Sequence, residues 1–466
     1  MALPLQTVDG RYKLIREFGG GVFLGKRQIQ DDEGLLSAAD REVVVKLESC
    51  GTEAPSLERE ANNLESLAGY IGVPLVQGRG TQGRYRFMVV CVPGPTLDSL
   101  LGYCKGRFSL KTVLLLGEQL IHRVELIHSQ GLIHGGIRPS AFGLGVEKAG
   151  GRVTLVEVAA LTPTTEPTQR YSDLKALVLM CIYMCRRLAP WEGLQTDLTK
   201  ARYEDILQRM ENTRVEVLCR GLPRVFKDCL EHVESSSQNR EPDYNHLREL
   251  FRTAFSEKGF SRDGVFDWTA YKYLNNLRQS CQPVTGIIDE VGNMRISVEG
   301  FENELKLLAE EISEAEGACA LLTKANEADK TQLCYTKAIS IHYAIVGLYI
   351  DMLLFAQLPE APAGVQSWPE DHQLPDKVWQ VGIEPCLKLL EAGLPHTQGH
   401  LEACLHKVFD TLTLLAEGVT CHKVKWTRCI RDVSRYGMKY DTHVLWARVK
   451  SRWGEPAGDV LEAPAP

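Results

Sequence analysis

The stretch that decides the fold is "SLKTVLLLGEQLIHRVELIHSQGLIHGGIRPSAFGLG", residues 109–145. Its first part repeats apolar residues at helical spacing and ends at Gly131, a residue type that commonly follows the last turn of a helix. After Gly131 the pattern changes to a short segment that contains His134 and two adjacent glycines. We therefore expect a long buried helix and, at its end, a loop held in a fixed position.

The segment before this helix favours strands. Residues 11–18, 41–49 and 84–92 are β-branched or aromatic runs ("RYKLIREF", "REVVVKLES", "RYRFMVVCV") bounded by Gly, Asp or Pro. One helix is predicted among them, in "PSLEREANNLESLAGY" (55–70), where Leu57, Ala61, Leu64 and Leu67 recur at helical spacing. Helical patterns dominate from Leu97 to about Tyr273. A small strand-rich part followed by a larger helical part is predicted.

Several separate stretches carry a family resemblance. They are "FSLKTVLLLGEQLIHRVELIHSQGLIH" (108–134), "APWEGL" (189–194), "EVLCRGLP" (216–223), "PDYNHLRELFR" (242–252) and "GFSRDGVFDW" (259–268). In this order they resemble the casein kinase 1 family of protein kinases, over roughly residues 11–275. The resemblance implies a bilobal protein-kinase-like domain (1–280), with a small lobe over about 11–95 and a large lobe over about 96–280. Together with the helical patterns of the remaining residues, this predicts an α+β fold in which an all-α C-terminal domain follows the kinase-like domain.

The resemblance also implies where the phosphate-transfer groups of a kinase would stand. Lys46 in "EVVVK" matches the phosphate-binding lysine, and Glu60 matches its helix glutamate. Their ion pair can position phosphates or only fix the helix against the sheet, and we favour the second interpretation. In the catalytic loop Gly136 replaces the catalytic aspartate and Ala141 the metal-binding asparagine. Neither side chain accepts a proton or binds Mg²⁺.

The neighbouring loop and metal positions are altered as well. Gly135 and Arg138 complete the changed loop, and Glu157, Val158 and Ala159 align with Asp-Phe-Gly. Glu157 keeps a carboxylate on a longer arm, so weak metal binding stays open at this position. The segment "ALTPTTEPTQRYS" between Ala159 and Asp173 is far shorter than a usual activation segment, while Asp173 matches the aspartate that anchors the catalytic loop.

The adenine and phosphate contacts are changed too. Gly19 and Gly21 are kept in the glycine loop, but Leu24 takes the third glycine position, where a side chain obstructs close approach of phosphate. Pro93 matches the hinge residue whose backbone N–H would bond adenine, and proline has no N–H. We expect a catalytically inactive pseudokinase without cofactor or metal, which acts as a protein-interaction scaffold or a structural component of a larger assembly.

The alternative is an atypical nucleotide-binding enzyme with a rearranged site. It would use Lys46, Glu60, Glu157 and His134. Nucleotide binding with and without Mg²⁺ separates the two hypotheses, because only the second requires it.

The remaining residues, 281–454, predict a helical bundle domain. Two long helical stretches (298–329 and 330–358) come first, a Pro-rich connector (359–375) follows, and two further helices come after it. The periodicity at Leu401, Leu405, Val408, Leu412 and Leu415 fits an interhelical seam, which we interpret as intramolecular because it lasts only two to three heptads. A tetratricopeptide-like array stays open, and residues 455–466 are predicted to be disordered.

A basic and aromatic segment lies near the C-terminus, over 421–453. Such a mixture can contact acidic proteins or nucleic acid. The alternative, which we favour, is an amphipathic helix with its aromatic residues inside the bundle. The candidate interaction residues are Lys423, Lys425, Trp426, Arg428, Arg431 and Arg435.

Composition limits the class of protein. The 466 residues are 44% hydrophobic and 24% charged with a formal net charge of −7, which is ordinary globular material without a strong polyanion signal. The N-terminus lacks a signal-peptide pattern, and the longest apolar run, Tyr343–Leu358, is shorter than the roughly 20 residues that span a bilayer. The 14 cysteines show no metal-site or disulfide spacing. We expect an intracellular, cytoplasmic protein with protein partners and no membrane contact.

Overall fold

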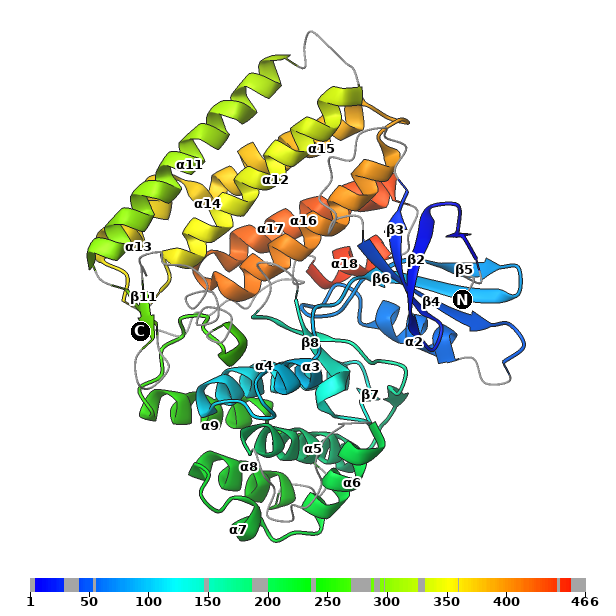
Figure 1. The fold of residues 1–466 in the computed structure, drawn as a ribbon, viewed down its shortest axis with the longest axis vertical. Helices are drawn as coiled ribbons and strands as arrows, with labels where there is room; N and C mark the ends of the chain where they lie inside the picture. Colours follow the sequence, from blue (N-terminus) through cyan, green and yellow to red (C-terminus); the bar gives the residue numbers. More distant parts are fainter. Residues whose placement is uncertain are drawn as a thin grey trace.

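The computed structural model describes residues 5–28, 42–52, 56–145, 151–186, 200–235, 240–269, 286–288, 294–296, 298–325, 332–358, 360–441 and 445–453. The chain is of α+β class, with an antiparallel sheet near the N-terminus and mostly helices after it (Figure 1). The predicted domain boundary at 280/281 and the predicted disordered tail lie outside the described residues.

The N-terminal sheet has six antiparallel strands in the order β1-β2-β3-β4-β6-β5. Its strands are β1 (Thr7–Val8), β2 (Tyr12–Gly19), β3 (Val22–Arg27), β4 (Glu42–Ser49), β5 (Val76–Gln82) and β6 (Tyr85–Cys91), and α2 (Ser56–Ser66) lies between β4 and β5 in sequence. The three predicted strands and the predicted helix are confirmed. β3 and β5 contain glycine and polar residues and were not predicted from the pattern.

The two faces of the sheet belong to different cores. Side chains alternate along a strand, so Val43, Val45 and Leu47 of β4 join one cluster, whereas Val44 joins the cluster that continues beneath α2. Because both faces of the sheet are buried, the sequences of β4 and β6 contain continuous apolar runs instead of alternating apolar and polar residues.

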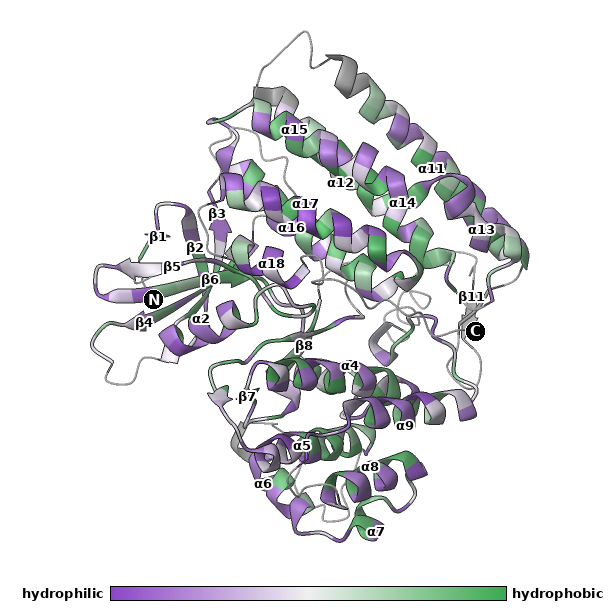
Figure 2. Cartoon of the chain, turned by 180° about the vertical axis from the view of Figure 1, so that it is seen from behind, coloured by the Kyte–Doolittle hydropathy of each residue, from purple (hydrophilic) through white to green (hydrophobic). Residues whose placement is uncertain are grey.

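The first helical region is built around residues 109–145. Leu110–Ser129 forms α4, and the side-chain hydroxyl of Ser109 accepts a hydrogen bond from the N–H of Thr112 at its start. The other elements are α3 (Leu97–Tyr103), β7 (Leu132–Ile133), a 3₁₀ turn (Pro139–Ala141), β8 (Phe142–Leu144), β9 (Val153–Leu155), β10 (Thr162–Pro163), α5 (Pro167–Cys185), α6 (Lys200–Glu211), α7 (Val215–Leu218), α8 (Arg224–Ser235) and α9 (Tyr244–Glu257). Figure 2 shows hydrophobic residues along α4 and α5, which lie side by side at the centre of this region.

The C-terminal region is mostly helical, but it is not all-α as predicted. It begins with a hairpin of β11 (Gly286–Ile288) and β12 (Met294–Ile296). Two long helices, α11 (Val298–Ala325) and α12 (Gln332–Phe355), follow as predicted. The later elements are α13 (Ala363–Asp371), α14 (Leu374–Lys377), a π-helical segment (Val378–Ile383), α15 (Glu384–Ala392), α16 (Gln398–Gly418), a 3₁₀ turn (Thr420–His422), α17 (Lys423–Tyr440) and α18 (Leu445–Trp453).

Two predictions for this region need comment. The Pro-rich connector is largely helical, because Pro369 is buried within α13 and Pro375 stands in the first turn of α14, where its missing N–H is tolerated. The five seam residues of α16 are all buried within the chain's own second core, so the intramolecular interpretation is confirmed. α12 contains a stretch, Ala338–Phe355, that is long and apolar enough to cross a membrane by length and composition, and half of it is buried inside the structure.

The C-terminal region is joined to the sheet region by a shared core. The core cluster of the C-terminal helices includes Ala68 and Leu75, which follow α2. The guanidinium of Arg452 donates to the carbonyls of Ser66 and Ala68, and the indole N–H of Trp453 donates to Gly69 O at 2.6 Å. Ser66 is the last residue of α2, where helical carbonyls lack internal partners, and Ala68 and Gly69 belong to the turn that follows it. α18 therefore lies against the loop after α2 (Figure 1).

The first helical region contributes fewer contacts to this interface. Arg123 Nη2 lies 2.7 Å from Glu417 Oε1, and the Nη1 group of Arg152 donates to Thr413 Oγ1 at 3.1 Å. The described cysteines form no disulfides.

The buried ion pair of Lys111 and Asp263 gives a stability prediction. Lys111 Nζ lies 2.8 Å from both carboxylate oxygens of Asp263, and both side chains are 3% exposed. Lys111→Met leaves a carboxylate in the core without its counter-ion and is expected to lower the free energy of unfolding by about 3–5 kcal/mol. The matched control is Arg224→Met, which removes an exposed pair with Asp228 and is expected to change it by at most about 0.5 kcal/mol. Equal losses in urea denaturation of the two variants would contradict the prediction.

Candidate functional site

Lys46 and Glu60 form an ion pair between the sheet and α2. Lys46 on β4 places its Nζ 2.5 Å from Glu60 Oε1, and Glu60 is buried. The same helix is tied to the opposite side of the site, because the Asn63 side-chain amide donates to Val158 O at 2.9 Å. α2 is thus fixed between the sheet and the segment that follows Glu157.

The glycine turn between β2 and β3 is held against β4. Gly19, Gly20 and Gly21 all have positive φ. A Cβ on Gly21 would lie 2.3 Å from the carbonyl oxygen of Leu47, whose own N–H donates to Gly21 O at 2.7 Å. Gly21 is therefore required for packing, and Leu24 lies in β3, paired with Arg16 and Val44.

Asp173 fixes the loop at the end of α4. It lies on α5, is 4% exposed, and accepts the backbone N–H groups of His134 at 2.6 Å and Gly135 at 2.9 Å. His128 Nε2 lies 3.0 Å from the same carboxylate, and its Nδ1 lies 2.7 Å from the hydroxyl of Tyr244. Gly135 adopts φ +62°, a conformation that glycine enters without strain.

The carboxylate of Glu157 is occupied by neighbours from the same loop. Arg138 donates through Nη2 to Glu157 Oε2 and through Nε to Ser140 Oγ at 2.9 Å, and Ser140 Oγ donates to Glu157 Oε1 at 3.1 Å. Both oxygens of Glu157 thus have protein donors. Arg138 Nη1 also lies 3.8 Å from Glu204.

The two positions that match the missing kinase side chains differ in surroundings. A Cβ on Gly136 would meet nothing closer than Arg138 Nη1 at 3.7 Å, so space for a side chain exists there. Ala141 is completely buried, and its carbonyl accepts the N–H of Val156 at 2.9 Å. Val158 is also completely buried, whereas Ala159 is half-buried.

The chain between Ala159 and α5 is short and ordered. Its only strand among these residues, β10, pairs with β7, and Thr164 N–H donates to Gly131 O at 2.8 Å. α5 then begins at Pro167. The segment is thus as short as the sequence indicates. It passes the end of α4 and leads directly into α5.

His134 lies inside the fold rather than in an open site. It is 1% exposed beside Phe142, with ring centroids 5.5 Å apart, and neither ring nitrogen has a hydrogen-bond partner. Burial lowers the pKa of His134 from its ordinary value, although nearby Asp173 opposes the shift. The lowered pKa favours the neutral form of the ring.

The basic C-terminal segment is largely paired or buried. Trp426 is completely buried and its indole N–H donates to Val419 O at 3.0 Å, so it does not face a partner. Lys425 lies 3.0 Å from Asp376 and Arg435 lies 2.5 Å from Asp432. Lys423 and Arg428 are exposed, as is Val424 (67%), and Arg431 is half-buried.

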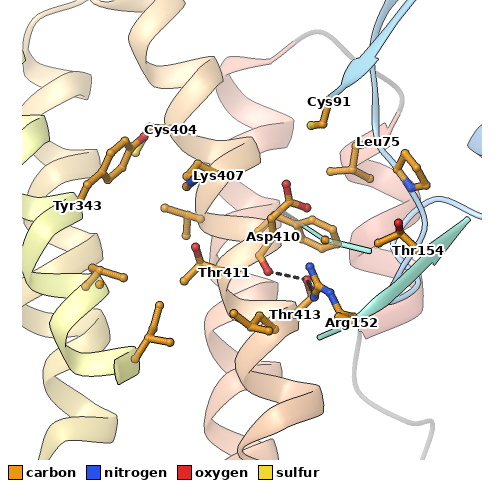
Figure 3. A pocket seen from close by; sticks show the side chains of 18 of the residues that line it. Leu75, Cys91, Arg152, Thr154, Tyr343, Cys404, Lys407, Asp410, Thr411 and Thr413 are labelled. Atoms are coloured by element: carbon orange, nitrogen blue, oxygen red, sulfur yellow. Dashed lines mark hydrogen bonds between the residues drawn. The ribbon is translucent and has the colours of Figure 1, made fainter. Parts of the chain in front are cut away.

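Pro93 lies at a cavity that the sequence did not suggest. This interface cavity, about 440 Å³, lies between the segments Gly72–Leu75 and Cys91–Gly94, strand β9 and helices α12, α15 and α16. Arg152, Thr154, Lys407 and Asp410 are among its polar lining residues, and Figure 3 shows Asp410 between α16 and the strand that carries Thr154. No motif marks these residues, because they converge only when the two ends of the chain meet.

No protein-family model matches this chain. Among the described residues, no group of three or more His, Cys, Asp and Glu side chains is placed to hold a metal ion.

The buried, neutral His134 predicts a pH dependence of stability. Its folded pKa is lowered, whereas the unfolded value is about 6.5. The unfolded state therefore binds more protons below about pH 6.5, so this contribution to stability is complete above that pH and is lost as the pH falls. His134→Leu is expected to reduce the loss between about pH 6.5 and 5.5 by up to about 1.4 kcal/mol per pH unit.

The measurement is urea denaturation of both proteins across this range. His396→Leu, at an exposed histidine, serves as the control and should follow the parent protein. Parallel pH profiles for the parent and His134→Leu would contradict the assignment of a neutral buried ring.

Proposed function

We propose that this chain is a catalytically inactive pseudokinase of casein kinase 1-like fold, which acts in the cytoplasm as a protein-interaction scaffold within a larger assembly. The observation that carries the proposal is the arrangement of Arg138, Ser140 and Glu157, in which protein donors occupy the carboxylate at the matched metal position. A guanidinium there supplies the positive charge that Mg²⁺ would otherwise supply.

The fold supports the kinase-like part of the proposal. An antiparallel sheet carries Lys46 and a helix carries Glu60, and a larger helical region follows with the loop 134–141 held by Asp173. These are the scaffold positions of the family resemblance. The chemical positions, Gly136 and Ala141, lack the required side chains.

The alternative enzyme finds less support in the geometry. Of its four residues, His134 is buried with a lowered pKa and Glu157 is held by Arg138. Lys46 and Glu60 are left, and their mutual pair is sufficient to fix α2. A base and a free metal ligand are both required for the usual reaction, so two members of this set no longer serve it.

A scaffold role is supported by the way the two ends of the chain are joined. α18 contacts the loop after α2 through Arg452 and Trp453, and the shared core includes Ala68 and Leu75. A rigid joint of this kind presents the sheet region and the C-terminal helices to partners in one fixed geometry.

The partner surface that we propose is the outer face of α17. Val424, Arg428, Arg435 and Met438 recur at helical spacing and are exposed. This stripe combines two apolar residues with positive charge, which suits an acidic protein segment with apolar anchors. Nucleic acid is less suited, because the aromatic residue Trp426 is buried and cannot stack on bases.

The first prediction from this proposal concerns catalysis. Purified full-length protein with radiolabelled ATP and Mg²⁺ or Mn²⁺ is expected to transfer no more phosphate to an acidic substrate or to itself than its Lys46→Met variant does. ATP with Mg²⁺ is expected to raise the melting temperature by less than about 1 °C, because a ligand that does not bind the native state does not stabilise it. Transfer that disappears in Lys46→Met would establish the enzyme instead.

The second prediction concerns the partner surface. The full-length variant Lys423→Glu/Arg428→Glu is expected to recover less of its acidic protein partners on co-purification, with identification by mass spectrometry. The matched control Arg224→Glu/Lys258→Glu makes the same charge change at exposed residues elsewhere and should recover them normally. The interaction should also weaken as salt rises to physiological strength, where the Debye length is about 8 Å. Equal recovery by both variants would place the partner surface outside α17.

A further inference from the structure

The interface cavity is separate from the Lys46–Glu60 ion pair and from the loop 134–141, although Pro93 is one of its lining residues. Lys46, Glu60, Gly136 and Glu157 do not line it. One wall comes from the sheet side and β9, and the other from α12, α15 and α16, so it exists only where the two ends of the chain meet. Its volume of about 440 Å³ lies within the range of about 300–1,000 Å³ that is typical of small-molecule sites.

Strand β9 directs two polar side chains to this cavity. Arg152 and Thr154 are two residues apart, so they share one face of the strand, while Val153 and Leu155 face the core. Arg152 is only 9% exposed, and its Nε has no hydrogen-bond partner. Thr154 Oγ1 is also buried without a partner. Buried polar groups are nearly always hydrogen-bonded, so two unpartnered groups on one strand face indicate a missing acceptor.

The rest of the Arg152 side chain is held in place. Its Nη1 group donates to Thr413 Oγ1 at 3.1 Å, which fixes the guanidinium against α16 (Figure 3). The guanidinium is therefore positioned before any ligand arrives, and an oxyanion that accepts from Nε and from the Thr154 hydroxyl would satisfy both.

The charges around the cavity set the charge of the ligand. Arg152, Lys407 and Asp410 are its charged lining residues, and they sum to one positive charge. Asp410 is partly accessible through the cavity and otherwise surrounded by protein; burial raises its pKa, against the effect of Arg152. Burial likewise lowers the pKa of Arg152. A monoanion balances the net charge, whereas a phosphate dianion would exceed it and be repelled by Asp410.

The remaining wall is apolar. Leu75, Val346, Ile350, Val408 and Leu414 line it together with the ring of Phe409. A ligand that fills the cavity must therefore carry an apolar body next to its charged group.

We propose that the interface cavity binds a small amphipathic monocarboxylate, with the carboxylate on Arg152 Nε and Thr154 Oγ1 and the apolar body between α12 and α16. Bound there, the ligand contacts both parts of the chain and stabilises their joint by mass action.

The test uses four probes with one phenylpropyl skeleton and different head groups: 3-phenylpropionate, 3-phenylpropylammonium, 3-phenylpropanol and 3-phenylpropyl phosphate. Binding to the full-length protein is measured by calorimetry, with the melting temperature as a second readout. 3-Phenylpropionate is expected to bind and to raise the melting temperature, and to bind at least about tenfold more tightly than the other three, since only it offers a monoanionic acceptor.

Variants of the cavity assign the contacts. Arg152→Met and Thr154→Val are each expected to weaken 3-phenylpropionate binding, Arg152→Met by at least about tenfold. Because Arg152→Met removes a buried group that also contributes to folding, Thr411→Trp is the second variant: Thr411 is half-buried at the cavity, and the larger side chain fills it without changing charge. Arg224→Met, far from the cavity, is the control for a lost arginine.

Four results would overturn the proposal, the first three of which concern 3-phenylpropionate. These are no binding of 3-phenylpropionate at millimolar concentration, binding of the alcohol or the ammonium probe as tight as that of the carboxylate, and unchanged carboxylate binding in Thr411→Trp. Preference for the phosphate probe would also overturn it and would assign the site to a dianion.

Discussion

The buried carboxylate of Asp173 is the interaction on which the central part of the structure depends. It joins α5 to the backbone of His134 and Gly135 and to His128 at the end of α4. A carboxylate in this position costs solvation free energy, which three donors offset. Because the loop is fixed at these two residues, Arg138 and Ser140 lie where they can bind both oxygens of Glu157. The same anchor thus preserves the loop geometry in which Arg138 and Ser140 donate to the Glu157 carboxylate.

The second constraint is the joint between the chain ends. Arg452 and Trp453 satisfy carbonyls that α2 leaves without partners, and Ala68 and Leu75 complete the core of the C-terminal helices. α2 also carries Glu60, and Asn63 of the same helix donates to Val158 O. A change at the joint therefore reaches the pair with Lys46 through one rigid helix. This connection gives a physical route by which a molecule in the interface cavity could act on the candidate site.

Packing among the C-terminal helices explains why the basic segment is less exposed than its composition indicates. Charged residues on α17 pair with carboxylates of earlier elements, as Lys425 does with Asp376 and Lys439 with Glu391. Trp446 packs against Phe409 and His406, so it belongs to the core. The basic and aromatic composition therefore predicts more exposed surface than this segment has in the structure. The exposed stripe of α17 is the part of the segment that stays available to partners.

The sequence by itself determined the elements whose signals are local. Periodicity located α2, α4 and α16, and residue identity alone established that Gly136, Ala141 and Pro93 lack particular chemical groups. It missed β3 and β5, which contain glycine and polar residues, and the hairpin β11–β12, whose strands are only three residues long. Tertiary structure decided that Glu157 is bound by Arg138, that His134 is buried, and that Arg152 and Asp410 share a cavity. These outcomes depend on contacts between segments up to hundreds of residues apart, and such contacts leave no periodic or spacing signal in a single sequence.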